Sequence, residues 1–114
     1  LIHKSAQIFG SAYIDKSLIL YPNTIISSFS KIGIGNIVSY GSLVGHNVVI
    51  GKFNYICPSC NILGNVKIGN YCFIGSNVTI LPNIKIPSYS AIPAGSVITR
   101  NPEKNSIFKT YSKK

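Results

Sequence analysis

The chain has 114 residues, a length that fits one domain. Eleven Lys and Arg residues against two Asp and Glu residues give a net charge of +9, which favours anionic over cationic partners. The sequence has no run of eighteen apolar residues and no recognition motif for nucleic acid, so it predicts neither a membrane-spanning helix nor a nucleic-acid-binding protein.

The dominant pattern is an aliphatic residue at every sixth position from Ile2 to Ile98, without exception. A fixed period decides the fold before any other signal, and six is not the period of a helix. The chain is therefore predicted to be built from hexapeptide repeats. The aliphatic positions are Ile2, Ile8, Ile14, Leu20, Ile26, Ile32, Val38, Val44, Ile50, Ile56, Ile62, Ile68, Ile74, Ile80, Ile86, Ile92 and Ile98.

Two further positions of each repeat follow the same period. Residues two places before the aliphatic one are mostly small or β-branched, which suits a second inward side chain. Residues three places after it are rich in Gly and Asn, which accept the left-handed backbone of a tight corner. Each repeat thus predicts a short strand and a corner. The corner residues of this kind are Asn23, Gly35, Gly41, Asn47, Asn65, Asn77, Asn83 and Gly95.

Three repeats close a triangular coil of eighteen residues, and successive coils stack as parallel strands about 4.8 Å apart. We expect an all-β prism of five to six coils over residues 1–100 and a basic tail over residues 101–114. Residues eighteen apart should form columns. The expected columns are an inner ladder of Ile14, Ile32, Ile50, Ile68 and Ile86, an aromatic stack of Phe53, Tyr71 and Tyr89, and a corner ladder of amides at Asn47, Asn65 and Asn83.

The positions of the three cysteines in the repeat explain them better than a disulfide, redox or metal-binding role does. An odd number argues against a disulfide framework, and Cys60 and Cys72 fall on the small inward position, where Cys serves as a small hydrophobe. We interpret them, and Cys57 beside them, as structural rather than redox-active or metal-binding. A reducing, cytoplasmic setting is the default for such a chain. Because the chain opens at Leu1 and has no methionine, we also expect a fragment or a processed form.

His46 is the residue best placed for chemistry. It lies two residues past the inward Val44, hence at a corner and facing outward, and Gly64 stands eighteen residues later in the same column. His3 lies in the opening repeat, and we interpret it as structural.

The repeat pattern of an aliphatic residue, Gly, two variable residues and a small residue resembles that of the hexapeptide acyltransferases, whose fold is a left-handed parallel β-helix. From Val44 to Thr99 the chain is similar to bacterial sugar acetyltransferases of the sialic-acid O-acetyltransferase and UDP-4-amino-sugar N-acetyltransferase type. The stretches that carry the similarity are residues 45–53, 64–69, 73–76 and 92–100.

This resemblance implies a homotrimer with acetyl-CoA in the groove between neighbours. It implies His46 as the general base and the backbone N–H of Gly64 as the donor to the oxyanion. Tyr55 stands where the family has a second histidine near the thioester. The small residues expected beside the acetyl-CoA are Gly75, Ser76, Ala94 and Gly95. The acceptor would be an amino or hydroxyl group of a sugar or nucleotide sugar.

Two features depart from the family, and alternatives stay open. The family often has an acidic residue beside its histidine, whereas the neighbours here are Gly45 and Asn47, and the ending at residues 107–111 differs as well. A non-catalytic trimerisation or scaffold module is therefore the alternative function. Carbonic anhydrases of the γ type need three histidines around zinc, so the chain's two histidines argue against a metal site.

Overall fold

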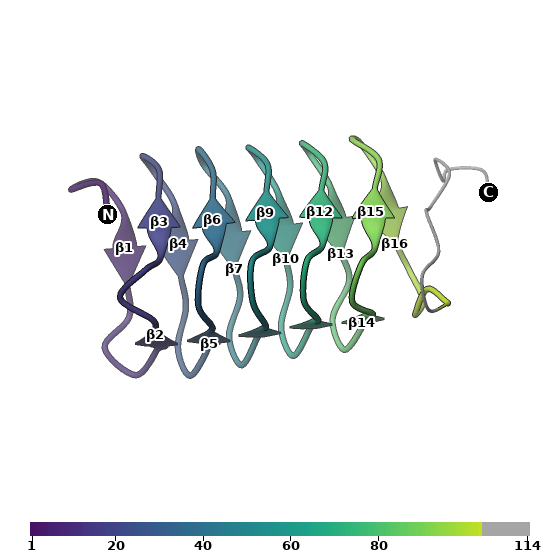
Figure 1. Ribbon diagram of the computed structural model, residues 1–114, viewed down its shortest axis with the longest axis horizontal. Helices are drawn as coiled ribbons and strands as arrows, with labels where there is room; N and C mark the ends of the chain where they lie inside the picture. The colour runs from purple at the N-terminus through teal and green to yellow at the C-terminus, as the bar shows by residue number, and fades with distance from the viewer. Residues whose placement is uncertain (104–114) are drawn as a thin grey trace.

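The computed structural model describes residues 1–103; the expected basic tail therefore falls almost wholly outside the described residues. The described chain winds as a left-handed parallel β-helix of five complete coils and one further strand (Figure 1). Its strands are two residues long and form three parallel sheets, the sides of a triangular prism. In Figure 1 sheet A is the front row, sheet B lies behind it and sheet C runs along the lower side. No helix of residues 1–103 is long and apolar enough to cross a membrane.

Each sheet takes every third strand. Sheet A contains β3 (Ile19–Leu20), β6 (Ile37–Val38), β9 (Tyr55–Ile56), β12 (Phe73–Ile74) and β15 (Ala91–Ile92). Sheet B contains β1 (Gln7–Ile8), β4 (Ile25–Ile26), β7 (Leu43–Val44), β10 (Asn61–Ile62), β13 (Thr79–Ile80) and β16 (Val97–Ile98). Sheet C contains β2 (Tyr13–Ile14), β5 (Lys31–Ile32), β8 (Val49–Ile50), β11 (Lys67–Ile68) and β14 (Lys85–Ile86).

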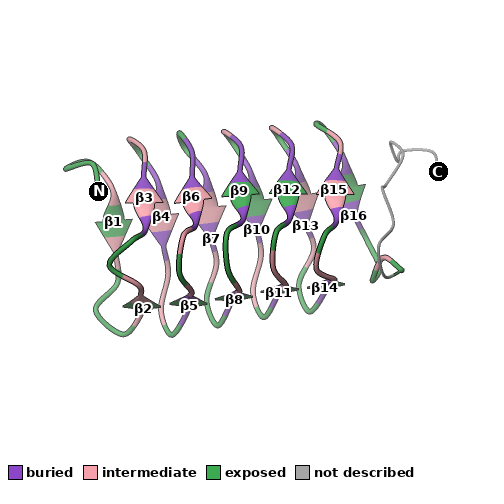
Figure 2. Ribbon diagram, viewed as in Figure 1, coloured by how far each residue is buried: buried purple, intermediate pink, exposed green. Residues whose placement is uncertain are grey.

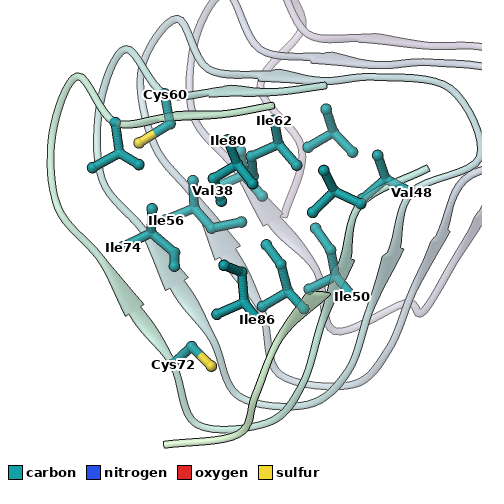
Figure 3. Packing of buried hydrophobic residues seen from close by; sticks show 14 of the residues in the cluster. Val38, Val48, Ile50, Ile56, Cys60, Ile62, Cys72, Ile74, Ile80 and Ile86 are labelled. Atoms are coloured by element: carbon teal, nitrogen blue, oxygen red, sulfur yellow. The ribbon is translucent and has the colours of Figure 1, made fainter. Parts of the chain in front are cut away.

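The register confirms the eighteen-residue coil. Ile50 pairs with Ile68, and Ile68 pairs with Ile86, in parallel strands of sheet C. The second residue of each strand points inward and the first points outward, so burial alternates along the chain (Figure 2). Inward side chains from all three sheets meet along the axis (Figure 3). Each fully buried Ile contributes roughly 1.5–3 kcal/mol, so this ladder supplies most of the stability.

A polar ladder runs inside the prism, which the sequence pattern did not predict. Asn36 and Asn54 are both buried, and the Nδ2 of Asn54 donates to the Oδ1 of Asn36 at 3.0 Å and to the carbonyl of Gly69 at 2.9 Å. The Oδ1 of Asn54 accepts from the backbone N–H of Cys72 at 2.7 Å. These bonds satisfy the buried amides, which would otherwise cost stability.

The corners have a left-handed backbone at every sixth residue from 23 to 95. All eight Gly and Asn positions expected from the sequence have positive φ. Five other residues also have it, although they are neither Gly nor Asn: Phe29, Phe53, Ser59, Tyr71 and Tyr89. Such a backbone costs a bulky residue about 1–3 kcal/mol.

Stacking offsets part of this cost for three of the aromatic residues. Ring centroids lie 5.6 Å apart for Phe53 and Tyr71 and 5.4 Å apart for Tyr71 and Tyr89, with nearly parallel planes. The expected aromatic stack is thus confirmed. Each such pair contributes about 0.5–1.5 kcal/mol beyond its buried area.

The amide corner differs from the expected ladder of side chains. Backbone N–H groups join the coils there: Asn65 donates to the carbonyl of His46, and Asn83 donates to that of Gly64, each at 3.0 Å. The side chain of Asn47 instead pairs with the ring of His46. The left-handed backbone explains this arrangement, because it aims the corner N–H along the axis at the preceding coil.

All three cysteines are free and buried. Burial raises the pKa of the Cys60 thiol to about 11, and it also raises the pKa values of Cys57 and Cys72. The Sγ of Cys60 donates to the carbonyl of Gly75 at 3.0 Å. Since the thiolate is the reactive form, these thiols are poor nucleophiles, in agreement with their structural interpretation.

Neighbouring residues of β8 test the inward and outward assignment. Ile50 is 2% exposed and Val49 is 38% exposed. We expect Ile50→Asp to lower the free energy of unfolding by about 3 kcal/mol or more, because a carboxylate would lie unpaired in the axial ladder. Val49→Asp should leave it within about 1 kcal/mol of the parent value, as is usual for surface positions. Urea unfolding followed by circular dichroism measures both, and equal stability of the two variants would show that the register is wrong.

Candidate functional site

His46 lies at the corner that joins sheet B to sheet C, just after β7. The chain around it is held by neighbouring coils: the N–H of Gly45 donates to the carbonyl of Ile62 at 2.7 Å, and the N–H of Asn47 donates to the carbonyl of Ser28 at 2.9 Å. The His46 side chain is exposed. The sequence prediction of an outward histidine at a fixed corner is confirmed in this respect.

Asn47 fixes the protonation pattern of the imidazole. Its Oδ1 lies 3.0 Å from the Nδ1 of His46. An amide oxygen accepts only, so Nδ1 carries the proton and donates it to this bond. In the neutral ring, the other nitrogen, Nε2, then has a free lone pair and lies beside Gly64. A neutral histidine in this tautomer can accept a proton from a substrate.

Gly64 lies directly beside the imidazole in the next coil. A side-chain carbon at this position would come within 2.5 Å of the Nε2 of His46 and 2.7 Å of its Cε1. Any larger residue would therefore displace the ring from this position. Within residues 1–103 the backbone N–H of Gly64 donates no hydrogen bond, so it is available to a ligand beside Nε2.

The four small residues predicted beside the acetyl-CoA gather at another corner, where sheet A joins sheet B. The N–H of Gly95 donates to the carbonyl of Ser76 at 2.8 Å, and a side-chain carbon at Gly75 would lie 2.5 Å from the nitrogen of Ala94. The two corner segments thus lie close together in successive coils. Within one chain it does not meet His46, because the two corners are separated by the width of sheet B.

Tyr55 is also remote from His46 within one chain. It points outward from β9 in sheet A, the side of the prism opposite the corner that holds His46. Its ring stacks on Phe73 with centroids 5.7 Å apart, and both rings are partly exposed. Residues eighteen apart in the sequence lie in the same column of the prism. Tyr55 follows His46 by only nine residues, or half a coil, so it lies on the opposite side of the prism.

The three outer faces of the prism differ in chemistry. The outward residues of sheet A are all apolar: Ile19, Ile37, Tyr55, Phe73 and Ala91. Those of sheet C include three lysines: Tyr13, Lys31, Val49, Lys67 and Lys85. Sheet B is mixed, with Gln7, Ile25, Leu43, Asn61, Thr79 and Val97.

Known proteins share this repeat and this fold. The family model of the bacterial transferase hexapeptide (six repeats) matches residues 47–82 and 65–100. The acetyltransferase domain of PglB from Neisseria gonorrhoeae FA1090, in complex with acetyl coenzyme A, is similar with a TM-score of 0.91 and 25% identity, over 94% of this chain and 52% of that one.

PerB from Caulobacter crescentus, in complex with CoA and GDP-perosamine, is similar in fold with a TM-score of 0.74 and 24% identity, over 88% of this chain and 51% of that one. A hexapeptide transferase family protein from Anaplasma phagocytophilum shares the fold with a TM-score of 0.69 and 21% identity, over 92% and 70% of the two chains. This chain therefore spans about half the length of the PglB domain and of PerB.

The Asn47 contact generates a first prediction for the site. Asn47→Gly keeps a residue suited to the left-handed backbone but removes the acceptor, so we expect any reaction that uses Nε2 as a base to slow by about 10–100-fold, the usual cost of losing a group that orients a histidine. Asn47→Asp retains an acceptor oxygen and should retain turnover. The steady-state rates of both variants measure this, and equal rates would show that the contact with Nδ1 is unimportant.

Gly64 and Gly10 provide a matched pair, since they stand in one column. Gly64→Ala would push the imidazole aside, and misplacing a catalytic group by about 1 Å can cost roughly 10²-fold in rate. Gly10→Ala meets nothing within 4 Å and should leave the rate unchanged. Rates and thermal melts of both variants test this; a fully active Gly64→Ala protein would contradict the placement of the ring.

Proposed function

We propose that this chain, whose residues 47–100 consist of bacterial transferase hexapeptide repeats, transfers an acetyl group from acetyl-CoA to an amino or hydroxyl group of a sugar or nucleotide sugar. The observation that carries the proposal is the position of the His46 Nε2 beside Gly64, with Nδ1 bonded to Asn47. The similar fold of a PglB domain with bound acetyl-CoA supports acetyl-CoA as the co-substrate.

The geometry supports general base catalysis by His46. Nε2 removes a proton from the acceptor amine or hydroxyl, whose nitrogen or oxygen then attacks the thioester carbonyl. A new bond forms to the carbonyl carbon, and the N–H of Gly64 stabilises the resulting oxyanion. The carbon–sulfur bond then breaks, and the imidazolium returns the proton to the departing thiolate. The acetylated acceptor and free CoA are the products.

A homotrimer accounts for the separation of the predicted site residues. Within one chain, Tyr55 and the small corner around Gly75 and Gly95 lie on other sides of the prism than His46. A neighbouring copy can bring its sheet A and the adjoining corner to the His46 corner of the first. The apolar outer face of sheet A fits such burial. Acetyl-CoA would then lie between the two copies.

One observation favours a non-catalytic scaffold as the second candidate function. Asn47 orients the imidazole but carries no charge that would stabilise the imidazolium formed during catalysis. The prism could then serve to hold copies together. The two functions differ in whether acetyl-CoA binds and whether it is consumed.

Calorimetric titration with acetyl-CoA, together with the mass in solution, tests the proposal. The acetyltransferase hypothesis predicts a trimer that binds acetyl-CoA with micromolar affinity. A folded trimer that binds no acetyl-CoA would support the scaffold instead.

Replacement of His46 tests the mechanism itself. His46→Ala should lower turnover by roughly 10²–10⁴-fold and leave the affinity for acetyl-CoA nearly unchanged, because the base acts on the acceptor proton. His3→Ala is the control, since His3 pairs with Ser5 in the opening repeat. Thiol release from acetyl-CoA in the presence of amino sugars and nucleotide-linked amino sugars measures the rate. Full activity in His46→Ala would remove this histidine from the mechanism.

A further inference from the structure

Phe29 adopts a strained corner backbone that no contact of its own ring explains. Its φ is 60°, in the left-handed region that a bulky residue adopts only at a cost. At the other corner, Phe53, Tyr71 and Tyr89 offset this cost by stacking on one another. The Phe29 ring is 63% exposed and has no aromatic partner within residues 1–103. Backbone strain that nothing local offsets points to a function.

Phe29 lies on the same edge of the prism as His46. It follows β4 and precedes β5, at the corner that joins sheet B to sheet C. It stands eighteen residues before Asn47, so the two backbones are about 4.8 Å apart in one column. The two coils are joined here, because the N–H of Asn47 donates to the carbonyl of Ser28 at 2.9 Å. Phe29 is therefore one coil from the residues that hold the imidazole, on the N-terminal side.

The two substrates of the proposed reaction need different sides of His46. Gly64 lies in the next coil on the C-terminal side, and its N–H is the donor to the oxyanion, so the thioester lies there. The acceptor has to bring its amino or hydroxyl group to Nε2 without occupying the same space. The N-terminal side, where Phe29 lies, is left for the body of the acceptor.

The polar groups beside Phe29 favour a sugar over an apolar protein surface. Ser27 and Ser28 are half-buried, and their hydroxyl groups make no hydrogen bond within the part of the chain that the structure describes. A pyranose has an apolar face of C–H groups and a rim of hydroxyl groups. An aromatic ring can cover that face while serine hydroxyls bond to the rim. An apolar surface of a second copy would instead leave both serine hydroxyls unpaired, which costs stability.

We propose that the ring of Phe29 is the platform on which the sugar ring of the acceptor stacks, with the hydroxyl groups of Ser27 and Ser28 at the rim of that sugar. This proposal rests on the proposed function, because the reacting group of the stacked sugar is the one that meets Nε2 of His46. It makes Phe29 a residue that binds the acceptor and not the donor. A flat platform also selects a cyclic sugar over an open-chain amine or alcohol.

Phe29→Asn separates the role of the ring from that of the backbone. Asn tolerates positive φ, so the variant should melt at the temperature of the parent or higher. Loss of the ring should raise the KM for glucosamine about 10-fold and leave the affinity for acetyl-CoA within about twofold of the parent. Phe29→Tyr keeps an aromatic ring and should keep the KM of the parent. Thermal melts, calorimetric titration and initial rates at saturating acetyl-CoA measure these effects.

Tyr89→Asn is the matched control. Tyr89 has a φ of 65° and is 64% exposed, but it lies at the corner between sheets C and A. Its replacement should therefore leave the KM for glucosamine unchanged. An unchanged KM in folded Phe29→Asn would overturn the platform. A lower mass in solution for Phe29→Asn would also overturn it, because the ring would then be a contact between copies.

Saturation-transfer NMR separates this proposal from the proposed function, because it needs no turnover. Methyl glucosaminide carries a sugar without a nucleotide, and UDP carries a nucleotide without the sugar in question. Transfer from the protein to the C–H groups of the glucosaminide should be clear in the parent and weak in Phe29→Asn. That result in a parent that transfers no acetyl group would keep the platform and reject the catalytic function. Equal transfer in both proteins, or a difference seen only with UDP, would overturn the platform; a parent with neither transfer to the glucosaminide nor acetylation would overturn both.

Discussion

The stacking of an inward aliphatic residue on its counterpart eighteen residues later is the constraint on which the rest of the structure depends. It fixes the length of each coil, because a coil of any other length would turn its large side chains out of the axis. It also fixes the corners, where the chain must bend by the same amount after every strand. Thirteen consecutive left-handed corners, five of them at residues that resist this conformation, show that the ladder dominates local backbone preference.

The same stacking brings the candidate site together. His46 and Gly64 are eighteen residues apart, so the period that builds the core also places an imidazole beside a glycine that has no side chain to obstruct it. Asn47 contributes in two ways: its backbone adopts the left-handed corner, and its side-chain oxygen accepts a hydrogen bond from the Nδ1–H of His46. Position 47 thus needs a side chain that accepts a hydrogen bond and a backbone that tolerates positive φ. Few residues meet both needs, and Asn is one of them. With Asn47 in place of an acidic residue, the negative charge beside His46 is absent, but the imidazole is still held in a fixed orientation.

The sequence predicts which residues stack in the same column, but it does not predict which side of the prism each column lies on relative to another. The inner Ile ladder, the aromatic stack and the pairing of His46 with Gly64 all follow from counting in steps of eighteen. Tyr55 and Gly75 are different, because their relation to His46 depends on which side of the triangular prism each occupies. The internal bonds between Asn36 and Asn54 were also missed: a small polar residue at an inward position does not reveal its partner in the next coil. Phe29 at positive φ was missed because aromatic side chains give no signal for that backbone.

The eighteen-residue coil also limits how such a chain can change in length. Each coil touches only the coils before and after it, so stability is nearly a sum of neighbouring terms. The removal or duplication of one whole coil ahead of Ser28 would leave His46, Asn47 and Gly64 in the same relative positions. A gain of one or two residues within a strand between His46 and Gly64 would instead shift all later columns out of register. Related chains should therefore differ in length by whole coils, with shorter insertions confined to the exposed corners.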